Sequence, residues 1–290
     1  MSATHATLTT SETKGRAKFN TAKLVFYIIL VVMTGFFLMP VYVAIVTSLK
    51  GMEEVSRGTP WELPSSPTFA NYGNAWDQLK GGFLNSVILS VPGVAISAVL
   101  GSMNGYVLSK WKFKGSNTLF TVILFGMFIP YQSILIPLAQ FLQSINLYAT
   151  IPGLILVHVV YGIPITTLIF RNYYAGVPKE LIESGTIDGA GFFGIYRNIV
   201  LPLSVPAFVV VLIWQFTAIW NEFLFAVTLN SNPASQPITV ALAGIGSSQA
   251  GTDYGLQMAG SLITALPTLL VYIFLSRYFI RGLLAGSVKG

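Results

Sequence analysis

The polar side chains with the clearest capacity for chemistry lie inside apolar stretches. Trp220, Asn221 and Glu222 follow one another within the segment WQFTAIWNEFLF, and Tyr131 and Gln132 directly follow Pro130. A carboxylate at membrane depth is costly and is a functional candidate by default. Amide and carboxylate groups hydrogen-bond hydroxyls, and aromatic faces pack on C–H surfaces. These residues are therefore candidates for contacts with a polyhydroxylated solute, and the alternative is that they only pack or bond to neighbouring helices.

The sequence offers few residues for metal binding, nucleophilic catalysis or nucleotide binding. The sequence contains no cysteine and only two histidines, His5 and His158, which lie far apart. It also lacks the G-x-x-x-x-G-K-[ST] phosphate loop, and no Gly-Lys pair occurs anywhere. We therefore expect no catalytic residue, no metal site and no cofactor bound by this chain.

A second group of residues forms a polar segment between Arg171 and Pro202. Pro178 suits a first helical position, and the acidic residues of the next turns favour a helix N-terminus. Gly189 and Gly191 allow a sharp turn into a second short helix around 192–198. A helix lying on lipid would carry basic residues, whereas this one carries Glu180, Glu183 and Asp188, so docking into a protein groove fits better.

These residues are positioned by apolar helices. Of the 290 residues 53% are hydrophobic and only 9% are charged, against about 25% charged in soluble domains. Six runs come near the roughly 20 residues that cross a bilayer. The six runs are Lys23–Ser48, Phe83–Leu108, Leu119–Leu142, Ile151–Phe170, Leu203–Leu229 and Leu256–Ile280. The fold class is therefore an all-α membrane protein with six transmembrane helices.

The basic residues set the orientation of these spans. With the N-terminus inside, 13 of the 16 Lys and Arg residues lie in cytoplasmic segments, and the net charge of +6 needs no nucleic-acid partner. The predicted division is a flexible cytoplasmic tail at 1–22, a six-helix domain at 23–281 and a cytoplasmic C-terminal tail at 282–290. In the second span, Ser97, Gly101 and Gly105 form a small-residue stripe, which we expect to face protein rather than lipid.

The segment ESGTIDGAGFFGIYRNIVLP resembles the EAA loop of ABC importer permeases, here at about residues 171–202. In that pattern a Glu and two small residues precede a Gly by six positions, and I-x-L-P follows. The matching residues are Glu183, Ser184, Gly185, Gly189, Ile199, Leu201 and Pro202. Residues 49–85 and the ending GLLAGSVKG are similar to carbohydrate permeases of the maltose type.

The resemblance implies a function and its partners. Two permease subunits, forming a heterodimer in the membrane, would share the pathway. Two ABC ATPase subunits would bind the loop through Glu183, Ser184, Gly185, Asp188, Gly189, Leu201 and Pro202. ATP and Mg²⁺ would then be held by those partners, and an extracytoplasmic solute-binding protein would deliver a sugar or oligosaccharide. The chain would be a non-catalytic subunit in a prokaryotic cytoplasmic membrane, with both termini inside.

Three other functions stay open. An ABC permease for a non-sugar solute would share every feature above, and only the family resemblance argues against it. A secondary transporter would carry more ionisable residues within the membrane than Glu222. A membrane-embedded enzyme would need paired histidines, a cysteine or close carboxylates within the helices.

Overall fold

The computed structural model describes residues 21–111, 113–248 and 251–287. Most of the predicted tail at 1–22 lies outside the described residues. The chain divides into two units, Met1–Val43 and Ala44–Gly290. Helix α1 (Thr21–Ser48) is the described element that starts in the first unit, and all other elements belong to the second.

The second unit is built almost entirely from helices. The long ones are α3 (Ala70–Lys110), α6 (Ile151–Ala175), α10 (Val205–Trp220) and α13 (Tyr254–Ser287). The shorter ones are α2 (Met52–Arg57), α4 (Ser116–Phe125), α5 (Leu135–Ser144), α7 (Lys179–Ile187), α8 (Phe192–Ile195), α9 (Leu201–Leu203), α11 (Leu224–Leu229) and α12 (Ile238–Gly244). Two-residue strands β1 (Ser247–Ser248) and β2 (Gly251–Thr252) pair antiparallel.

The number of helices that could span a membrane agrees with the sequence prediction of six. Within the described residues, four helices are long and apolar enough to span a membrane, and the number rises to six if each of two bent pairs counts as one span. The predicted span Leu119–Leu142 corresponds to the first bent pair. The predicted span Leu203–Leu229 overlaps the second pair, which runs from Phe192 to Trp220, and its last part is the separate helix α11. The second span is longer than predicted, because α3 begins at Ala70 rather than near Phe83. Helix α13 continues to Ser287, so most of the predicted tail at 282–290 is helical.

Both breaks have a local cause. At the first, Ile129 is extended (φ −74°, ψ 118°) before Pro130, as the residue before a proline prefers, and the two halves meet at 88°. At the second, Ser204 (ψ 4°) precedes Val205-Pro206, and the segment 192–203 meets α10 at 75°. The Leu201 carbonyl accepts hydrogen bonds from both the backbone N–H (3.1 Å) and the hydroxyl (2.7 Å) of Ser204, which close the helix at the bend.

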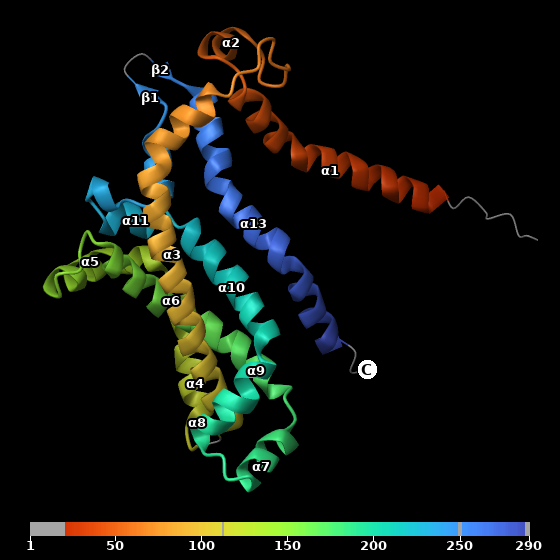
Figure 1. Ribbon diagram of the computed structural model, residues 1–290, viewed down its shortest axis with the longest axis vertical. Helices are drawn as coiled ribbons and strands as arrows, with labels where there is room; N and C mark the ends of the chain where they lie inside the picture. Colours follow the sequence, from red (N-terminus) through yellow and green to blue (C-terminus); the bar gives the residue numbers. More distant parts are fainter. Residues whose placement is uncertain (1–20, 112, 249–250, 288–290) are drawn as a thin grey trace, which may run out of the picture. The chain divides into compact units, whose positions relative to one another are not determined.

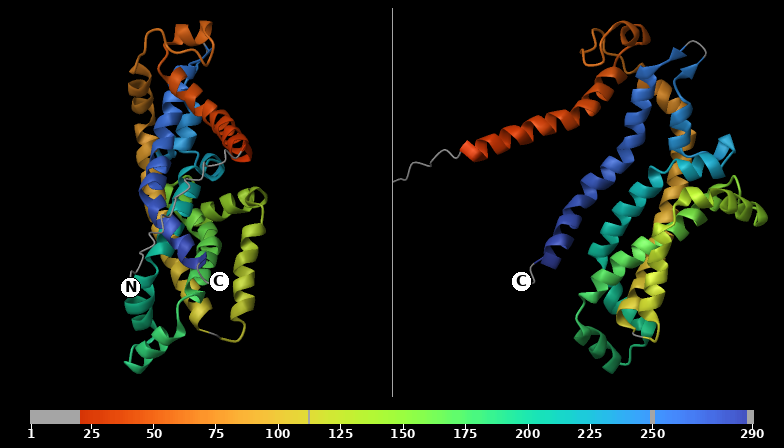
Figure 2. Two further views of the ribbon diagram at one scale, coloured as in Figure 1. Left: turned by 90° about the vertical axis from the view of Figure 1, so that its right-hand side faces the viewer. Right: turned by 180° about the vertical axis from the view of Figure 1, so that it is seen from behind.

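Helices α3, α6 and α10 pack side by side along the length of the second unit (Figures 1 and 2). The small-residue stripe of α3 lies close against α6. A Cβ atom added at Gly105 would lie 2.6 Å from Phe170 Cβ and 2.7 Å from Arg171 N, both on α6. At Gly101 it would lie 2.9 Å from the backbone carbon of Thr166. The stripe therefore faces protein, as predicted.

The two ends of this unit carry different elements. The hairpin of α7 and α8 lies at one end, and α2 with the β1–β2 pair lies at the other (Figure 1). Large apolar side chains of α4 and α5 are exposed, among them Phe125 and Ile136 (67% and 75%). Such a surface suits hydrocarbon, since helices satisfy their own backbone groups and need no water.

Candidate functional sites

The first candidate site is the hairpin of α7 and α8, which carries the acidic residues singled out in the sequence. Pro178 (ψ 138°) stands at the N-cap of α7 rather than at its first helical position. Glu183, Ser184 and Asp188 are exposed on this hairpin, whereas Gly185 is buried. A Cβ atom on Gly185 would lie 2.5 Å from Ile199 Cδ1, so a small residue here lets α7 lie against the segment that returns to α10.

Gly189 closes α7 through a Schellman motif. Its φ is +84°, its N–H donates to the Thr186 carbonyl at 3.0 Å, and the Ala190 N–H donates to the Gly185 carbonyl at 2.9 Å. The left-handed conformation is one that glycine adopts without the Cβ penalty of other residues. The predicted sharp turn is thus present, and its position is set by backbone hydrogen bonds.

Leu201 and Pro202 lie where the hairpin returns to the bundle. Residues Tyr196–Val200 form a π-helical turn, and α9 follows with Pro202 in its first turn. Proline lacks a donor N–H, so Pro202 cannot continue the backbone hydrogen-bond pattern of the preceding π-helical turn. Leu201 and Pro202 therefore belong to the connection between the hairpin and α10.

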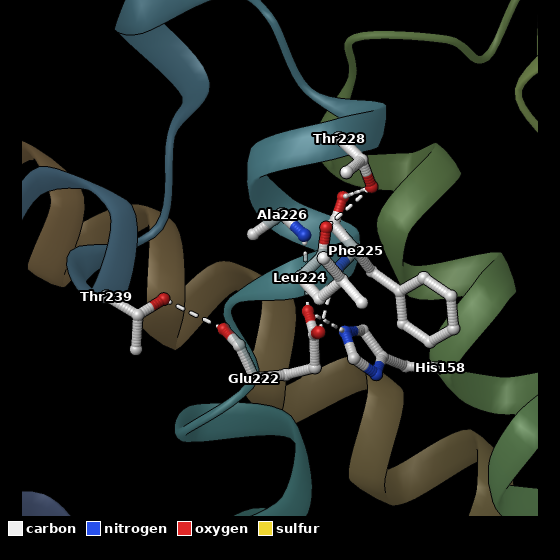
Figure 3. Close-up of polar contacts among 7 residues, drawn as sticks. All are labelled: His158, Glu222, Leu224, Phe225, Ala226, Thr228 and Thr239. Atoms are coloured by element: carbon white, nitrogen blue, oxygen red, sulfur yellow. Dashed lines mark hydrogen bonds and ion pairs between the residues drawn. The ribbon is translucent and has the colours of Figure 1, made fainter. Parts of the chain in front are cut away.

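The second candidate site lies at the C-terminal end of α10, in the short break between α10 and α11 (Figure 3). Glu222 follows α10, and its carboxylate accepts hydrogen bonds from the N–H groups of Phe225 (2.7 Å) and Ala226 (3.2 Å). Its backbone carbonyl accepts a hydrogen bond from the Thr239 hydroxyl at 2.8 Å. Glu222 thus caps the start of α11 and joins it to α12.

His158 of α6 faces this carboxylate. Its side chain is 7% exposed, and Nε2 lies 3.9 Å from Glu222 Oε2, too far for a hydrogen bond. Within the described residues, Nε2 of His158 is buried and has no hydrogen-bond partner. The imidazole ring packs edge-on against Phe225, with ring centres 5.9 Å apart.

Phe225 connects the two groups of candidate solute contacts. The ring of Tyr131 packs against it at 5.3 Å and that of Tyr161 at 5.2 Å, while Glu222 accepts its N–H. Tyr131 and Gln132 are exposed on the short helical turn after the Pro130 break. The structure therefore brings Tyr131 and Glu222 to the same aromatic cluster, although they are distant in the sequence.

Trp220 and Asn221 occupy different environments. Trp220 is 1% exposed, stacks on Phe216 with ring centres 5.4 Å apart, and donates its indole N–H to the Thr264 carbonyl at 2.9 Å. Asn221 is exposed and donates to the Thr217 carbonyl at 3.0 Å. Asn221 therefore has a face open to a solute in this conformation, and Trp220 packs between α10, α3 and α13.

The sequence analysis did not single out Phe225, Tyr161 or Thr239. A carboxylate just before an apolar run is a recognised sign of a helix start, so Glu222 followed by Leu224–Leu229 could have indicated the cap. No such sign exists for Tyr161 or Thr239, which reach the site only through folding. Among the described residues, no group of three or more His, Asp or Glu side chains is arranged to hold a metal ion.

A membrane bundle with an exposed acidic hairpin and a polar break in one span defines an integral membrane subunit of a transport system. Residues 93–283 match the family model described as the binding-protein-dependent transport system inner membrane component. The chain belongs to this family. It is the permease, a non-catalytic multi-pass component of a binding-protein-dependent ABC importer.

Characterised and inferred relatives cover nearly the whole chain. The xylose/arabinose import permease of Haloferax volcanii is 39% identical over 279 residues, covering 89% of this chain and 90% of that protein. A probable ABC transporter permease of Pyrococcus horikoshii is 44% identical over 265 residues, covering 91% and 96%. The diacetylchitobiose uptake permease of Streptomyces coelicolor is 34% identical over 255 residues, covering 87% and 82%.

A solved structure has the same fold. A chain of a bacterial ABC transporter involved in alginate import matches with a TM-score of 0.79 and 20% sequence identity, covering 91% of this chain and 100% of that one. At this level of identity the likeness concerns the fold. The predicted all-α permease fold is therefore confirmed.

Proposed function

We propose that this permease imports a sugar or an oligosaccharide together with a second, different permease chain and two ATPase subunits. An extracytoplasmic binding protein delivers the solute, and ATP and Mg²⁺ are bound by the ATPase subunits. The cargo class is supported by the sugar permeases among its relatives and by the tyrosine, amide and carboxylate groups near the broken span. Both termini are placed inside by the distribution of basic residues.

The observation that carries the ATPase contact is an exposed apolar surface on the α7–α8 hairpin. Ile187 at the end of α7 is 85% exposed and Phe193 in α8 is 68% exposed, and the carboxylates of Glu183 and Asp188 on the same hairpin are also exposed. Apolar side chains presented together on a small polar projection mark a protein-binding surface. An anionic lipid leaflet would repel the carboxylates, whereas a cleft in a partner subunit accommodates both kinds of group.

This surface gives the transport cycle a physical route. Closure of the ATPase dimer on ATP moves the docked hairpin, and the membrane helices follow as nearly rigid bodies, so that the pathway opens outward. Hydrolysis reverses the motion. Glu183 and Asp188 hold the docked hairpin, and Gly189 fixes its turn. None of them takes part in the hydrolysis itself.

The solute contacts we propose are Tyr131, Gln132, Asn221 and Glu222. Tyr131, Gln132 and Asn221 are exposed, and the partly buried Glu222 holds the backbone next to them in place. Trp220 supports the same region from behind by packing on Phe216. A sugar ring would find a tyrosine face and amide groups here, which are the partners its C–H surfaces and hydroxyls need.

The docking proposal is tested by Gly189→Asp. A side chain at φ +84° strains the Schellman turn and displaces the hairpin, so we expect ATPase assembly and transport to be lost while membrane insertion is unchanged. Gly191→Asp is the matched control, because Gly191 has φ −74° at the N-cap of α8, where aspartate is favoured. Copurification of the ATPase is the measurement. Full transport by the Gly189→Asp chain would refute the docking role.

The cargo is tested by ATP-driven uptake in vesicles that contain the complete transporter. Pentoses, disaccharides and longer oligosaccharides are offered in turn, with an amino acid and phosphate as non-sugar arms. Saturable uptake of one carbohydrate class supports the proposal. Uptake of a non-sugar alone would overturn the cargo assignment, and uptake without ATP would overturn the ATP-driven mechanism.

A further inference from the structure

A polar ladder on one face of α3 contacts the α7–α8 hairpin and its connections. Its members are Ser102, Tyr106 and Lys110, spaced four residues apart, and we call them the α3 ladder. Side chains at this spacing lie above one another on the same helix face. Each of the three makes a hydrogen bond to the hairpin, to the segment that leads into it or to the turn that follows it.

The first rung is a cluster of three hydroxyl groups. Ser102 Oγ lies 2.6 Å from Tyr174 Oη and 2.9 Å from Tyr196 Oη. Ser102 and Tyr174 are fully buried. A serine hydroxyl donates once and accepts twice, so Ser102 can bond to both phenols at once. The cluster therefore joins α3 to the end of α6 and to the π-helical turn after the hairpin.

The other two rungs bond to backbone carbonyls. Tyr106 donates to the Phe192 carbonyl at 3.1 Å, and its ring packs between those of Phe192 and Tyr196, with ring centres 5.0 and 5.2 Å away. Lys110 Nζ donates to the Val177 carbonyl at 2.6 Å, just before α7 begins. The hairpin is thus held to α3 at its entry, at the start of α8 and at its exit.

The connection from the hairpin to α10 is of a different kind. It runs through the π-helical turn Tyr196–Val200 and then through the 75° bend at Ser204. Helices deform most easily at irregular turns and sharp bends, which can act as hinges. A movement of the hairpin is therefore transmitted more directly to α3, through side-chain bonds, than to α10 along the backbone.

We propose that the α3 ladder, with Tyr174 and Tyr196, makes the hairpin and the adjoining part of α3 move as one body during the ATP cycle. These five side chains are positioning residues, because they act on the solute only through the helices they hold. The inference rests on the proposed docking of the hairpin to an ATPase. It adds the specific bonds through which the ATPase motion enters the membrane.

The test removes single oxygen atoms and leaves the packing in place. Tyr174→Phe, Tyr196→Phe and Ser102→Ala are assembled into the complete transporter, and solute transported per ATP hydrolysed is measured. We expect this ratio to fall about threefold to tenfold, the effect of losing about 0.7 to 1.4 kcal/mol of hydrogen bonding. ATPase activity and copurification of the ATPase should stay within about twofold of wild type.

The matched control is Tyr72→Phe. Tyr72 forms the same kind of bond, with Ser48 Oγ 2.7 Å from its hydroxyl, in the first turn of α3, whereas the ladder lies in the last turns of that helix. It should lower thermal stability by a similar amount and leave the transport ratio unchanged. If the ladder variants keep the wild-type ratio, or if Tyr72→Phe lowers it equally, the positioning role is refuted.

A distance measurement tests the rigid body directly. This chain has no cysteine, so cysteines placed at Val99 on α3 and Lys179 on α7 give one spin-label pair in it when the partner subunits are made free of reactive cysteines. The distance distribution should be the same with and without ATP in the wild-type background, and should broaden in the Tyr174→Phe/Tyr196→Phe chain. A second pair, Trp214 and Lys179, reports the hairpin against α10 and should shift when ATP binds.

The outcomes separate this inference from the function on which it rests. A shift of the Val99–Lys179 distance in a transporter that couples normally would overturn the rigid-body inference and leave the docking proposal intact. Absence of any ATPase bound to the wild-type chain would overturn the docking proposal, and the inference with it.

Discussion

Replacement of Gly105 by alanine is the sharpest test of the packing that supports both sites. A Cβ atom at Gly105 would lie 2.6 Å from Phe170 Cβ, 2.7 Å from Arg171 N and 2.9 Å from the Phe170 backbone carbon. These atoms belong to the α6 backbone or are bonded to it, so no rotamer change relieves the overlap. The two helices must separate by about 1 Å for ordinary van der Waals contact.

The size of the effect follows from a matched comparison within the same helix. Gly81 also lies in α3, and a Cβ atom there would meet nothing within 4 Å. Both substitutions gain about 1 kcal/mol of helix propensity. Only Gly105→Ala incurs the cost of overpacking, about 1 to 3 kcal/mol. We therefore expect the Gly105→Ala chain to be about 2 kcal/mol less stable than the Gly81→Ala chain.

Thermal unfolding of the purified transporter measures this difference. For a chain of 290 residues, about 2 kcal/mol corresponds to a Tm difference of about 3 °C. Transport should also fall, because separation of α3 from α6 pulls Ser102 away from Tyr174. Equal Tm values for the two variants, with equal membrane insertion, would show that α3 and α6 do not approach as closely as described.

Three further predictions concern other contacts. Gly162→Ala should destabilise the chain, because the nearest atom to the added Cβ is the flexible Gln215 Nε2, and adding Gln215→Ala should largely restore its stability. The Tm values of the two single variants and the double variant test this, and additive Tm changes would show that the two sites are not coupled. Glu222→Ala should lower stability by about 1 to 2 kcal/mol through loss of the α11 cap, and should reduce transport; normal expression with unchanged transport and selectivity would remove Glu222 from the pathway. The Ser65 N–H donates to Glu54 Oε1 at 2.6 Å and holds the pKa of Glu54 below its ordinary value. This contact therefore stabilises the loop between α1 and α3 above that ordinary pKa, and the stabilisation is lost as the pH falls through the lowered pKa. Faster exchange of the Ser65 amide in Glu54→Gln at neutral pH, with little difference from wild type at strongly acidic pH, would show this; equal exchange at neutral pH would contradict it.

The sequence determined the properties that depend on local composition. Apolar runs near 20 residues long predicted the spans. A charged residue in hydrocarbon is costly, so a long run without charges marks a span in the sequence alone. The small-residue stripe at Ser97, Gly101 and Gly105 predicted a close helix contact for a similarly local reason, since absent side chains permit close approach from any neighbour. The spacing from Glu183 to Pro202 identified the loop, and Gly189 its turn, because a left-handed cap has a strong glycine preference.

Only the tertiary structure decided which distant residues meet. Tyr131 and Glu222 both reach Phe225, and Ser102 reaches Tyr174 and Tyr196, through helix packing that no periodicity specifies. The bends of 88° and 75° lie at Pro130 and Ser204, but neither residue by itself specifies the angle between the two helices. Hydropathy and turn preference depend on neighbouring residues in the chain, so the sequence shows them directly. The partners of a side-chain hydrogen bond depend on how whole helices are rotated and shifted against one another.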